Sequence, residues 1–249
     1  MKSKDEFEIG LCNKCVTPFT SESVFFDSCG VCSVCHQIEF KTQNIDWNLR
    51  ENELDELIRE HRGKYDYDCI VPFSGGKDST YTLWYLSVVK NLKCLVVSFD
   101  HGFYRPTLLE NRKRTLKKLG QDFIQFTPNW KLVKKLMYES LVRRGDFCWH
   151  CHTGIFSFPM QIAIKFNVPL IFWGEPTGEY ASFYSYDEIE EVNEERFNRF
   201  VNLGITAEDM KGMLDDTISD YKPDERDFLP YTYPEKRALK NLRCKSVLL

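Results

Sequence analysis

Short apolar runs alternate with longer amphipathic stretches through the middle of the chain. The apolar runs have the length of β-strands and lie at 69–73, 94–99, 122–126 and 169–173. The stretches that separate them are long enough for helices and lie at 78–89, 107–119, 129–143 and 154–166. Strands that are apolar on both faces and alternate with helices are typical of a parallel sheet covered on both sides. The sequence therefore predicts a doubly wound α/β domain.

The pattern changes on either side of this domain. Residues 11–36 are rich in cysteine and turn-forming residues, and the stretch at 50–62 is predicted to be helical. Beyond Gly174, acidic and aromatic residues mix without a clear period, and two short helices are predicted at 187–200 and 207–214. We therefore divide the chain into a cysteine-rich segment at 1–44, a linking helix at 45–63, the α/β domain at 64–180 and an acidic, mainly helical part at 181–249.

The last residues of the chain, Ser246 to Leu249, are apolar enough to begin a buried strand, and no polar tail follows them. An apolar run at a chain end leaves a strand with nothing to pair with, so the sequence predicts a fragment of a longer polypeptide. The alternative is a terminal strand docked on the edge of the sheet.

The composition is that of a globular protein. Of the 249 residues, 43% are hydrophobic and 28% are charged, which excludes collagen-like, low-complexity and largely disordered proteins. The N-terminus carries charged residues instead of an apolar leader, and no run of about twenty apolar residues occurs, so secretion and a membrane span are not expected. Ten cysteines without an export signal argue against disulfides and for metal ligands, buried thiols or redox chemistry in a reducing cytoplasm.

The net charge of −4 hides an uneven distribution. Residues 105–144 hold eleven Lys or Arg against three acids, whereas residues 175–227 hold sixteen acids and five bases. The basic block favours a polyanionic partner such as a nucleotide, a nucleotide-sugar or an RNA, and the acidic part argues against coating a nucleic acid. A solvated helix face is the preferred interpretation for most of the bases near Arg112.

The sharpest motif lies between the first predicted strand and the helix that follows it. It consists of Ser74, Gly75, Gly76, Lys77, Asp78 and Ser79. In a parallel sheet a ligand binds here, outside the carboxyl end of a strand and at a helix N-terminus that favours a phosphate group. Two glycines allow the backbone to approach closely, and the serine hydroxyls add donors. The spacing is not that of a Walker loop.

These six residues resemble the pyrophosphate loop (PP-loop) of the ATP pyrophosphatase superfamily. The resemblance implies a sheet of the PP-loop type and an ATP that is cut between its α and β phosphates. It also implies that Asp78 helps to hold Mg²⁺ or to fix the loop, and that Lys77 neutralises charge on the leaving pyrophosphate, which makes these two the candidate catalytic residues. Asp100, directly after the second predicted strand, lies where the superfamily lines its nucleotide pocket.

Two Cys-x-x-Cys pairs lie near the N-terminus and are separated by sixteen residues. Their members are Cys12, Cys15, Cys32 and Cys35. Each pair presents two thiolates on one side of a turn, so together they can surround one Zn²⁺ tetrahedrally. Zinc binding supplies on the order of 10 kcal/mol of folding free energy, which a segment without its own core needs. Cys29 and His36 are further possible donors, but the four-cysteine set is preferred and predicts a small zinc-ribbon-like segment.

A third cluster, Cys148-Trp-His-Cys151-His152, lies between two predicted helices. It suits half of a metal site, a redox pair or a helix start that lines the active-site cleft. A full zinc or iron-sulfur site needs further ligands, and packed side chains without a function are an equally good interpretation. With Gly174 and Glu175, which follow the last predicted strand, these residues form a candidate cleft or second metal site.

Several segments together resemble the N-acetyl sugar amidotransferase family of bacterial lipopolysaccharide and O-antigen pathways, the WbpG type. These segments are Phe26-Asp27, Gly30-Val31-Cys32, Ile45-Asp46-Trp47, Arg50-Glu51, Tyr67-Asp68-Cys69-Ile70-Val71-Pro72, Cys148-Trp-His-Cys-His-Thr-Gly154 and Trp173-Gly-Glu-Pro176. The resemblance runs along essentially the whole chain. The loop at Ser74 to Ser79, the phosphate loop, indicates only the superfamily. The other segments narrow the resemblance to this family.

The resemblance implies that an acetamido group of a UDP-linked sugar is converted to an acetamidino group with ATP and ammonia. Transfer of AMP to the amide oxygen turns that oxygen into a leaving group, and ammonia then displaces AMP. The sequence holds no recognisable glutaminase residues. The resemblance therefore also implies a separate glutaminase subunit and a cyclase-like companion. Family members continue well past the length of this chain, in line with the predicted fragment.

Two other functions remain open at this point. A tRNA sulfur transferase of the PP-loop superfamily joins the same loop to zinc knuckles, but it needs core cysteines, and only Cys148 and Cys151 offer themselves. The other alternative is a non-catalytic scaffold protein that is stabilised by zinc, binds ATP and only serves to bind the glutaminase.

Overall fold

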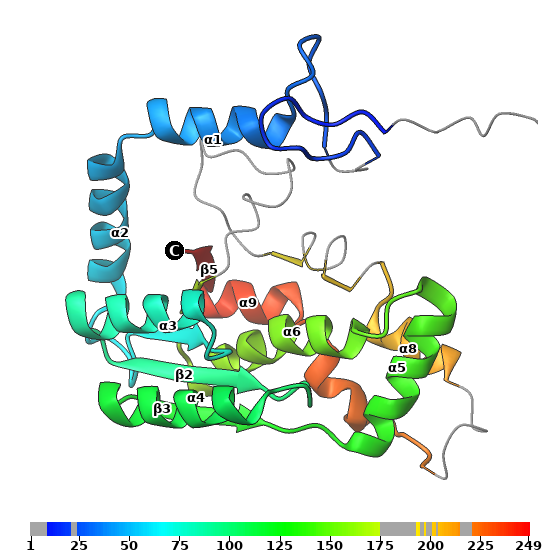
Figure 1. Ribbon diagram of the computed structural model, residues 1–249. Coiled ribbons are helices and arrows are strands. Elements are labelled where there is room, and N and C mark those ends of the chain that lie inside the picture. Colours follow the sequence, from blue (N-terminus) through cyan, green and yellow to red (C-terminus); the bar gives the residue numbers. More distant parts are fainter. Residues whose placement is uncertain are drawn as a thin grey trace, which may run out of the picture. The chain divides into compact units, whose positions relative to one another are not determined.

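The computed structural model describes residues 9–20, 24–174, 193–194, 197, 201–202, 204–214 and 221–249 (Figure 1). Contacts between residues divide the described part of the chain into two units, one that ends at Asp55 and one that begins at Glu56. The division falls inside helix α2 (Trp47–His61), which contributes residues to both units.

The second unit is built on a five-stranded sheet. Its strands are β1 (Cys69–Pro72), β2 (Cys94–Phe99), β3 (Asp122–Phe126), β4 (Leu170–Trp173) and β5 (Lys245–Leu248). They lie in the order β3-β2-β1-β4-β5, and every neighbouring pair is parallel. The residues of β1 and β2 are all buried, as expected for apolar runs that form the centre of a parallel sheet.

Helices connect the strands and continue beyond them. They are α3 (Lys77–Trp84), extended by a π-helical turn at Tyr85–Val89, α4 (Pro106–Leu119), α5 (Trp130–Arg144), α6 (Trp149–Phe166), α8 (Ala207–Met213), a 3₁₀ helix at Glu225–Tyr231 and α9 (Lys236–Leu242). The helix ends follow simple chemistry. Asn129 caps the N-terminus of α5 through its side chain, and Gly120 and Gly145 end α4 and α5 in left-handed conformations.

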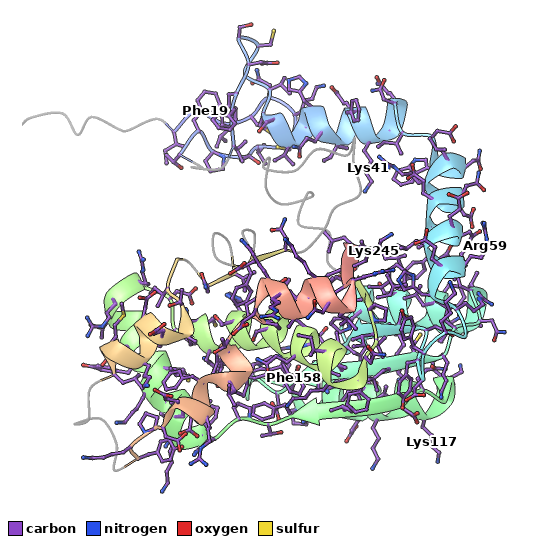
Figure 2. The ribbon with its side chains drawn as sticks, turned by 180° about the vertical axis from the view of Figure 1, so that it is seen from behind. Phe19, Lys41, Arg59, Lys117, Phe158 and Lys245 are labelled. Atoms are coloured by element: carbon purple, nitrogen blue, oxygen red, sulfur yellow. The ribbon has the colours of Figure 1, made fainter. Side chains whose placement is uncertain are left out.

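Strand β2 shows that both faces of the sheet are covered. Val97 and Phe99 belong to the main core together with side chains of α5 and α6, including Phe158, which is labelled in Figure 2. Ser98 lies on the opposite face, where its hydroxyl accepts a hydrogen bond of 3.0 Å from Arg112 of α4. The predicted doubly wound α/β fold is therefore confirmed.

Helix α6 corrects one predicted limit. The sequence predicts a start at residue 154, but the helix begins at Trp149 with Cys148 as its N-cap. Gly154 lies inside the helix, where the helix approaches Phe99 closely: a Cβ atom at this position would lie 2.4 Å from Phe99 Cζ. Cys151 and His152 are consequently helical instead of lying in a loop between helices.

Other elements escaped the sequence analysis. Helix α1 (Ser33–Gln43) begins inside the segment interpreted as turns, and neither the 3₁₀ helix nor α9 was expected. The predicted helix at 207–214 is present as α8, whereas the one at 187–200 falls largely outside the described residues. The final apolar run forms β5, which pairs with β4, as the alternative interpretation of that run predicts.

The first unit has a small core of its own. Cys12, Val31, Cys32 and Cys35 are buried together, with Phe26 packed against them. Two isolated antiparallel bridges, Leu11 to Pro18 and Phe26 to Cys32, hold the turns. The cysteines thus make up most of the interior of this unit.

No helix within the described residues combines the length and apolar character needed to cross a membrane.

Candidate functional site

The phosphate loop lies at the point where the strand order reverses. The chain runs outward from β1 through β2 to β3 and then returns to the other side of β1 as β4. Ligands of doubly wound sheets bind at the carboxyl ends of the strands at this point. Gly174 follows β4 directly, and a Cβ atom there would lie 2.7 Å from Thr82 Oγ1 and 3.1 Å from Ser79 Cα. The end of β4 therefore packs tightly against the helix that begins in the loop.

Gly75 gives the loop its sharp turn. Its φ angle is +84°, in the left-handed region that residues with a side chain rarely adopt. A Cβ atom at this position would lie 2.1 Å from Cγ of Arg112. Gly76 is different, because its backbone is extended and an added Cβ would lie 3.3 Å from Ser74 Oγ. Conformation and space therefore require glycine at 75 more strictly than at 76.

Hydrogen bonds from the two serines shape the rest of the loop. The hydroxyls of Ser74 and Ser79 share a hydrogen bond of 3.1 Å. The Gly75 N–H donates to Ser79 Oγ and the Gly76 N–H donates to Ser74 Oγ, each at 3.2 Å. Helix α3 starts at Lys77, and no described side chain caps it. Its first N–H groups lack partners within the helix, so the loop combines backbone donors, hydroxyls and a helix dipole, as a phosphate site requires.

The two candidate catalytic side chains face solvent beside the loop. Lys77 Nζ and Asp78 Oδ1 form an ion pair of 2.7 Å, with the lysine side chain 87% exposed and the aspartate side chain 46% exposed. Both side chains are therefore accessible to a ligand. An exposed pair of this kind holds its geometry weakly, so a ligand can separate it at little cost.

A pocket of about 480 Å³ adjoins the loop. Ser74 and Gly76 line one side of it, and the residues after β2 and at the start of α4 line the other: His101, Phe103, Tyr104, Arg105, Thr107, Leu108 and Asn111. Its volume lies in the range of small-molecule sites. The pocket therefore joins the loop at residues 74–79 to a wall of aromatic, apolar and polar side chains.

Asp100 follows β2 and is held in place by three hydrogen bonds. Its Oδ1 accepts from the Gly102 N–H at 2.9 Å, and its Oδ2 accepts from Gln125 Nε2 and from Thr127 Oγ1, each at 3.3 Å. The next residue, His101, lines the pocket described above. The structure therefore places Asp100 at the carboxyl edge of the sheet, next to the pocket wall.

Arg112 is an exception to the solvated helix face that the sequence favours for most of the basic residues around it. Its side chain is buried against the loop, with 3% exposure. The sequence contains a signal for this burial. Leu108, Arg112 and Leu116 follow one another at four-residue spacing and share the inner side of α4. A charged residue on the apolar side of a helix indicates a buried charge with a specific role.

The third sequence cluster lies at the start of α6, beside the loop that follows β2. His150 is fully buried, and its Nε2 lies 3.3 Å from the backbone oxygen of His101. Burial lowers the pKa of the His150 imidazole, which favours its neutral form. Cys148 is half-buried, Cys151 is buried and His152 is exposed. The cluster thus borders the pocket region, whereas Glu175 lies outside the described residues.

Burial also determines the chemistry of Cys148. Its backbone N–H donates to Asp146 Oδ1 at 2.6 Å, which brings the aspartate close. Burial, and then the negative charge of Asp146, raise the pKa of the Cys148 thiol. The thiol is therefore less reactive near neutral pH than an ordinary cysteine.

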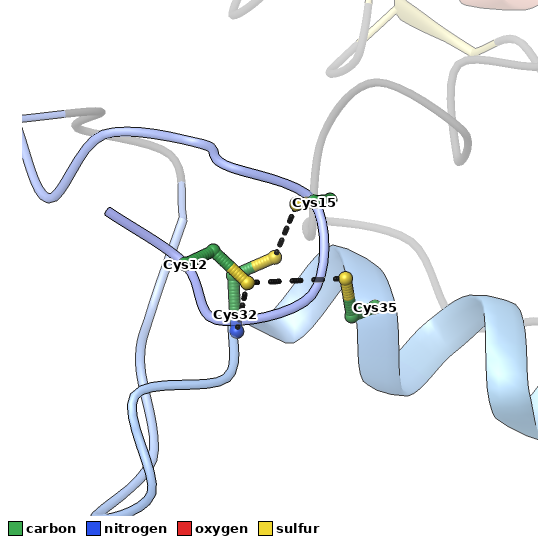
Figure 3. Close-up of side chains that lie close together, drawn as sticks. All are labelled: Cys12, Cys15, Cys32 and Cys35. Carbon is green, nitrogen blue, oxygen red and sulfur yellow. Dashed lines mark hydrogen bonds between the residues drawn. The ribbon is translucent and has the colours of Figure 1, made fainter.

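The four predicted zinc ligands come together in the first unit (Figure 3). Their sulfur atoms all lie within 4.8 Å of one another, with 4.0 Å between Cys12 and Cys35 and 3.4 Å between Cys15 and Cys32. Four thiolates at ~2.3 Å from one zinc would lie ~3.8 Å apart, so the spacing matches a tetrahedral site. Within the described ranges, this is the only group of three or more Cys, His, Asp or Glu side chains at metal-binding distance.

The surroundings of the cluster favour these four donors over Cys29 and His36. His36 Nε2 lies 2.8 Å from Asp27 Oδ2, so its ring is engaged by the aspartate. The other oxygen of Asp27 accepts from the N–H groups of Cys29 and Val31, at 2.8 and 2.9 Å. Asp27 thus ties the second turn together. The structure agrees with the choice of four cysteines.

Backbone donors favour the thiolate form of one member of the cluster, Cys12. Burial opposes its ionisation, but backbone N–H groups of Cys15, Lys14 and Cys32 act on its sulfur and lower its pKa to about 6. Two of these contacts are hydrogen bonds, from Lys14 at 3.4 Å and from Cys32 at 3.3 Å. Burial raises the pKa of the Cys32 and Cys35 thiols instead, so these two lose their protons when a metal binds.

No protein-family description and no curated protein matches the sequence. Among solved structures, the chain is similar to one titled as the crystal structure of a predicted subunit of tRNA methyltransferase from Methanocaldococcus jannaschii. The identity is 15%, the match covers 70% of this chain and 72% of that chain, and the TM-score is 0.33. A likeness this weak decides neither the substrate nor the reaction.

Proposed function

We propose that the chain is an ATP-dependent amidotransferase of the PP-loop type. It converts an acetamido group of a UDP-linked sugar to an acetamidino group, with AMP and pyrophosphate as products. The observation that carries the proposal is the position of the Ser-Gly-Gly-Lys-Asp-Ser loop, with Gly75 in a left-handed conformation at the switch point of a parallel sheet. The family resemblance given above supplies the sugar and the reaction.

The residues around the loop suit ATP in one orientation. The pyrophosphate portion would lie against the loop and the first backbone N–H groups of α3, and the nucleoside would extend into the pocket lined by Phe103 and Tyr104. Lys77 neutralises charge on the pyrophosphate. Asp78 offers a carboxylate oxygen at the helix start, where Mg²⁺ would be shared with the phosphates. When bound, Mg²⁺ neutralises the developing charge of the phosphates.

The chemistry then follows from the weakness of the amide as an electrophile. The acetamido oxygen attacks the α-phosphorus, and the bond to the β-phosphate oxygen breaks, releasing pyrophosphate. Ammonia adds to the resulting imidate carbon, AMP leaves with the former amide oxygen and a proton is lost, which leaves the amidine. The chain's own residues contribute by holding the two reactants in line and by stabilising charge on the leaving group.

Ammonia is supplied by a partner in this proposal. The resemblance implies a separate glutaminase and a cyclase-like companion, and neither a membrane span nor a nucleic acid is part of the scheme. The four-cysteine unit would bind Zn²⁺ as a structural element, since a tetrahedral set of four thiolates leaves no open position for a substrate.

Sulfur transfer to tRNA is the alternative reaction, and it needs a reactive thiolate. Burial and the negative charge of Asp146 raise the pKa of the Cys148 thiol, which does not favour that role for Cys148. The experiment below separates the two reactions.

The proposal is tested by incubating the chain with ATP, Mg²⁺, ammonium and a panel of UDP-acetamido sugars. We expect AMP release only when sugar and ammonium are both present, together with a sugar nucleotide in which NH replaces oxygen. Asp78→Ala is the matched control and should lose turnover while keeping its zinc. AMP release that depends on tRNA instead of the sugar would contradict the proposal.

A further inference from the structure

Arg112 is a buried cation whose hydrogen bonds are with neutral groups. Its Nη2 donates to Ser98 Oγ at 3.0 Å and to Gln125 Oε1 at 2.9 Å, and both acceptors are neutral. Its Nη1 is buried and has no hydrogen-bond partner in the described part of the chain. Among the described residues, no carboxylate lies within ion-pair distance of the guanidinium. A guanidinium remains charged inside proteins, so a compensating interaction is expected.

Two aromatic rings compensate the charge only in part. The guanidinium carbon lies 4.5 Å from the centre of the Tyr104 ring and 5.4 Å from that of Phe123. Cation–π contacts of this kind stabilise a buried charge without neutralising it. The positive charge therefore remains available to act on its surroundings, and a low-dielectric interior screens it weakly.

The stem of Arg112 also forms the floor of the phosphate loop. An added Cβ at Gly75 would lie 2.1 Å from Arg112 Cγ and 2.7 Å from its Cδ. The guanidinium begins just beyond Cδ, so the charge lies close behind the backbone on which a pyrophosphate group would sit. The loop conformation and the position of the charge are thus fixed by the same side chain.

The same guanidinium reaches the wall of the nucleotide pocket. Gln125, which accepts from Arg112, donates through Nε2 to Asp100 Oδ2. Tyr104, which stacks on Arg112, lines the pocket. The neighbouring His101 also responds to this environment: burial lowers its pKa most, Asp100 opposes the shift and the charge of Arg112 adds to it. Arg112 therefore connects the loop, Asp100 and the pocket wall.

We propose that Arg112 is a positioning residue for the polyphosphate of ATP: its stem shapes the loop at Gly75, and its buried charge provides the counter-charge for the bound phosphates. This inference rests on the proposed function, because it assumes that the loop binds pyrophosphate. Arg112 does not touch the phosphates in this account. It acts through the loop backbone and through its electric field.

The test compares phosphate-containing and phosphate-free ligands. Arg112→Met keeps an unbranched stem and removes the charge. Arg112→Lys keeps the positive charge but lacks the planar guanidinium. Lys113→Met is the control, because it removes an exposed charge from the same helix. Affinities of the full chain are measured for inorganic pyrophosphate with Mg²⁺, for ATP and for adenosine. We expect Arg112→Met to weaken pyrophosphate and ATP binding by roughly tenfold or more, while adenosine binding is unchanged.

Arg112→Lys should restore most of the pyrophosphate affinity, and Lys113→Met should resemble the unsubstituted chain. Should Arg112→Met fail to fold, Arg112→Gln removes the same charge and takes its place. Equal losses for adenosine and pyrophosphate would reduce Arg112 to a structural role and overturn the inference. Unchanged pyrophosphate affinity in the neutral variants would overturn it as well, leaving the proposed function intact. If the unsubstituted chain binds no pyrophosphate, the proposed function fails too.

Discussion

At the scale of single residues, the two glycines of the phosphate loop are not equivalent. Gly75 has a φ of +84° and no room for a Cβ, whereas Gly76 is extended and nearly has room for one. An alanine at 75 costs about 1–2 kcal/mol from its backbone alone, before the stem of Arg112 is displaced. We therefore expect Gly75→Ala to weaken ATP binding by roughly tenfold or more and Gly76→Ala much less.

Titration calorimetry with ATP and Mg²⁺ measures this difference directly. The melting temperature of each variant shows whether the change stays local to the loop. Equal affinities for ATP in the two variants would mean that the left-handed conformation of Gly75 is not needed for binding.

A second prediction at this scale concerns the thiol of Cys148. Because burial and Asp146 raise its pKa, the thiolate fraction near neutral pH is smaller than for an ordinary thiol. Alkylation of Cys148 by iodoacetamide, followed by peptide mass spectrometry, should be slower than that of free glutathione. Its rate should rise roughly tenfold per pH unit until the pH passes the raised pKa. Rapid alkylation at neutral pH would instead indicate an activated thiol, as sulfur transfer requires.

At the scale of secondary-structure elements, the chain is predictable where short, mainly apolar runs are bounded by turn signals. The limits of β2, whose residues are all buried, and of β3, whose residues are exposed or only partly buried, both match the sequence prediction. The start of α6 and the presence of α1 were missed. In both cases long-range contacts decide: Gly154 of α6 packs on Phe99, and Cys35 of α1 joins the cysteine cluster.

The candidate site divides in the same way. The residues of the phosphate loop and the four cysteines lie close together in the sequence at spacings that their chemistry requires. They could therefore be predicted from the sequence. The partners of Asp100 cannot be read from spacing, because Gln125 and Thr127 reach it from the neighbouring strand and its following loop. Arg112 reaches the loop only through the packing of α4 against the sheet.

The two cysteine-containing turns of the first unit predict which cysteines bind the metal. Cys15 belongs to the cluster, whereas Cys29 lies outside it and is held through its backbone, with its N–H donating to Asp27 and its carbonyl oxygen accepting from Asn13. Cys15→Ser should lower the zinc content of the purified chain well below one ion per chain, and Cys29→Ser should leave it unchanged. Elemental analysis by mass spectrometry measures both. Equal zinc loss in the two variants would show that the ligand set is different.

At the scale of the whole molecule, the two units have separate interiors. The first is built around its cysteines and the second around the sheet. Removing the metal with a strong chelator should therefore increase amide hydrogen exchange in residues 9–44 and leave β1 to β4 protected. Acidification should have the same local effect, because the thiolates take up protons and release the metal. Increased exchange throughout the sheet would contradict separate folding.

The central claim is that this chain cuts ATP between the α and β phosphates at the loop of residues 74–79. The most direct measurement is chromatography of the nucleotide products after incubation with ATP, Mg²⁺, ammonium and UDP-acetamido sugars, with Asp78→Ala as the blank. The account predicts AMP and pyrophosphate in equal amounts from the unsubstituted chain and little of either from the variant. ADP and phosphate as products, or AMP formation that survives in Asp78→Ala, would contradict it.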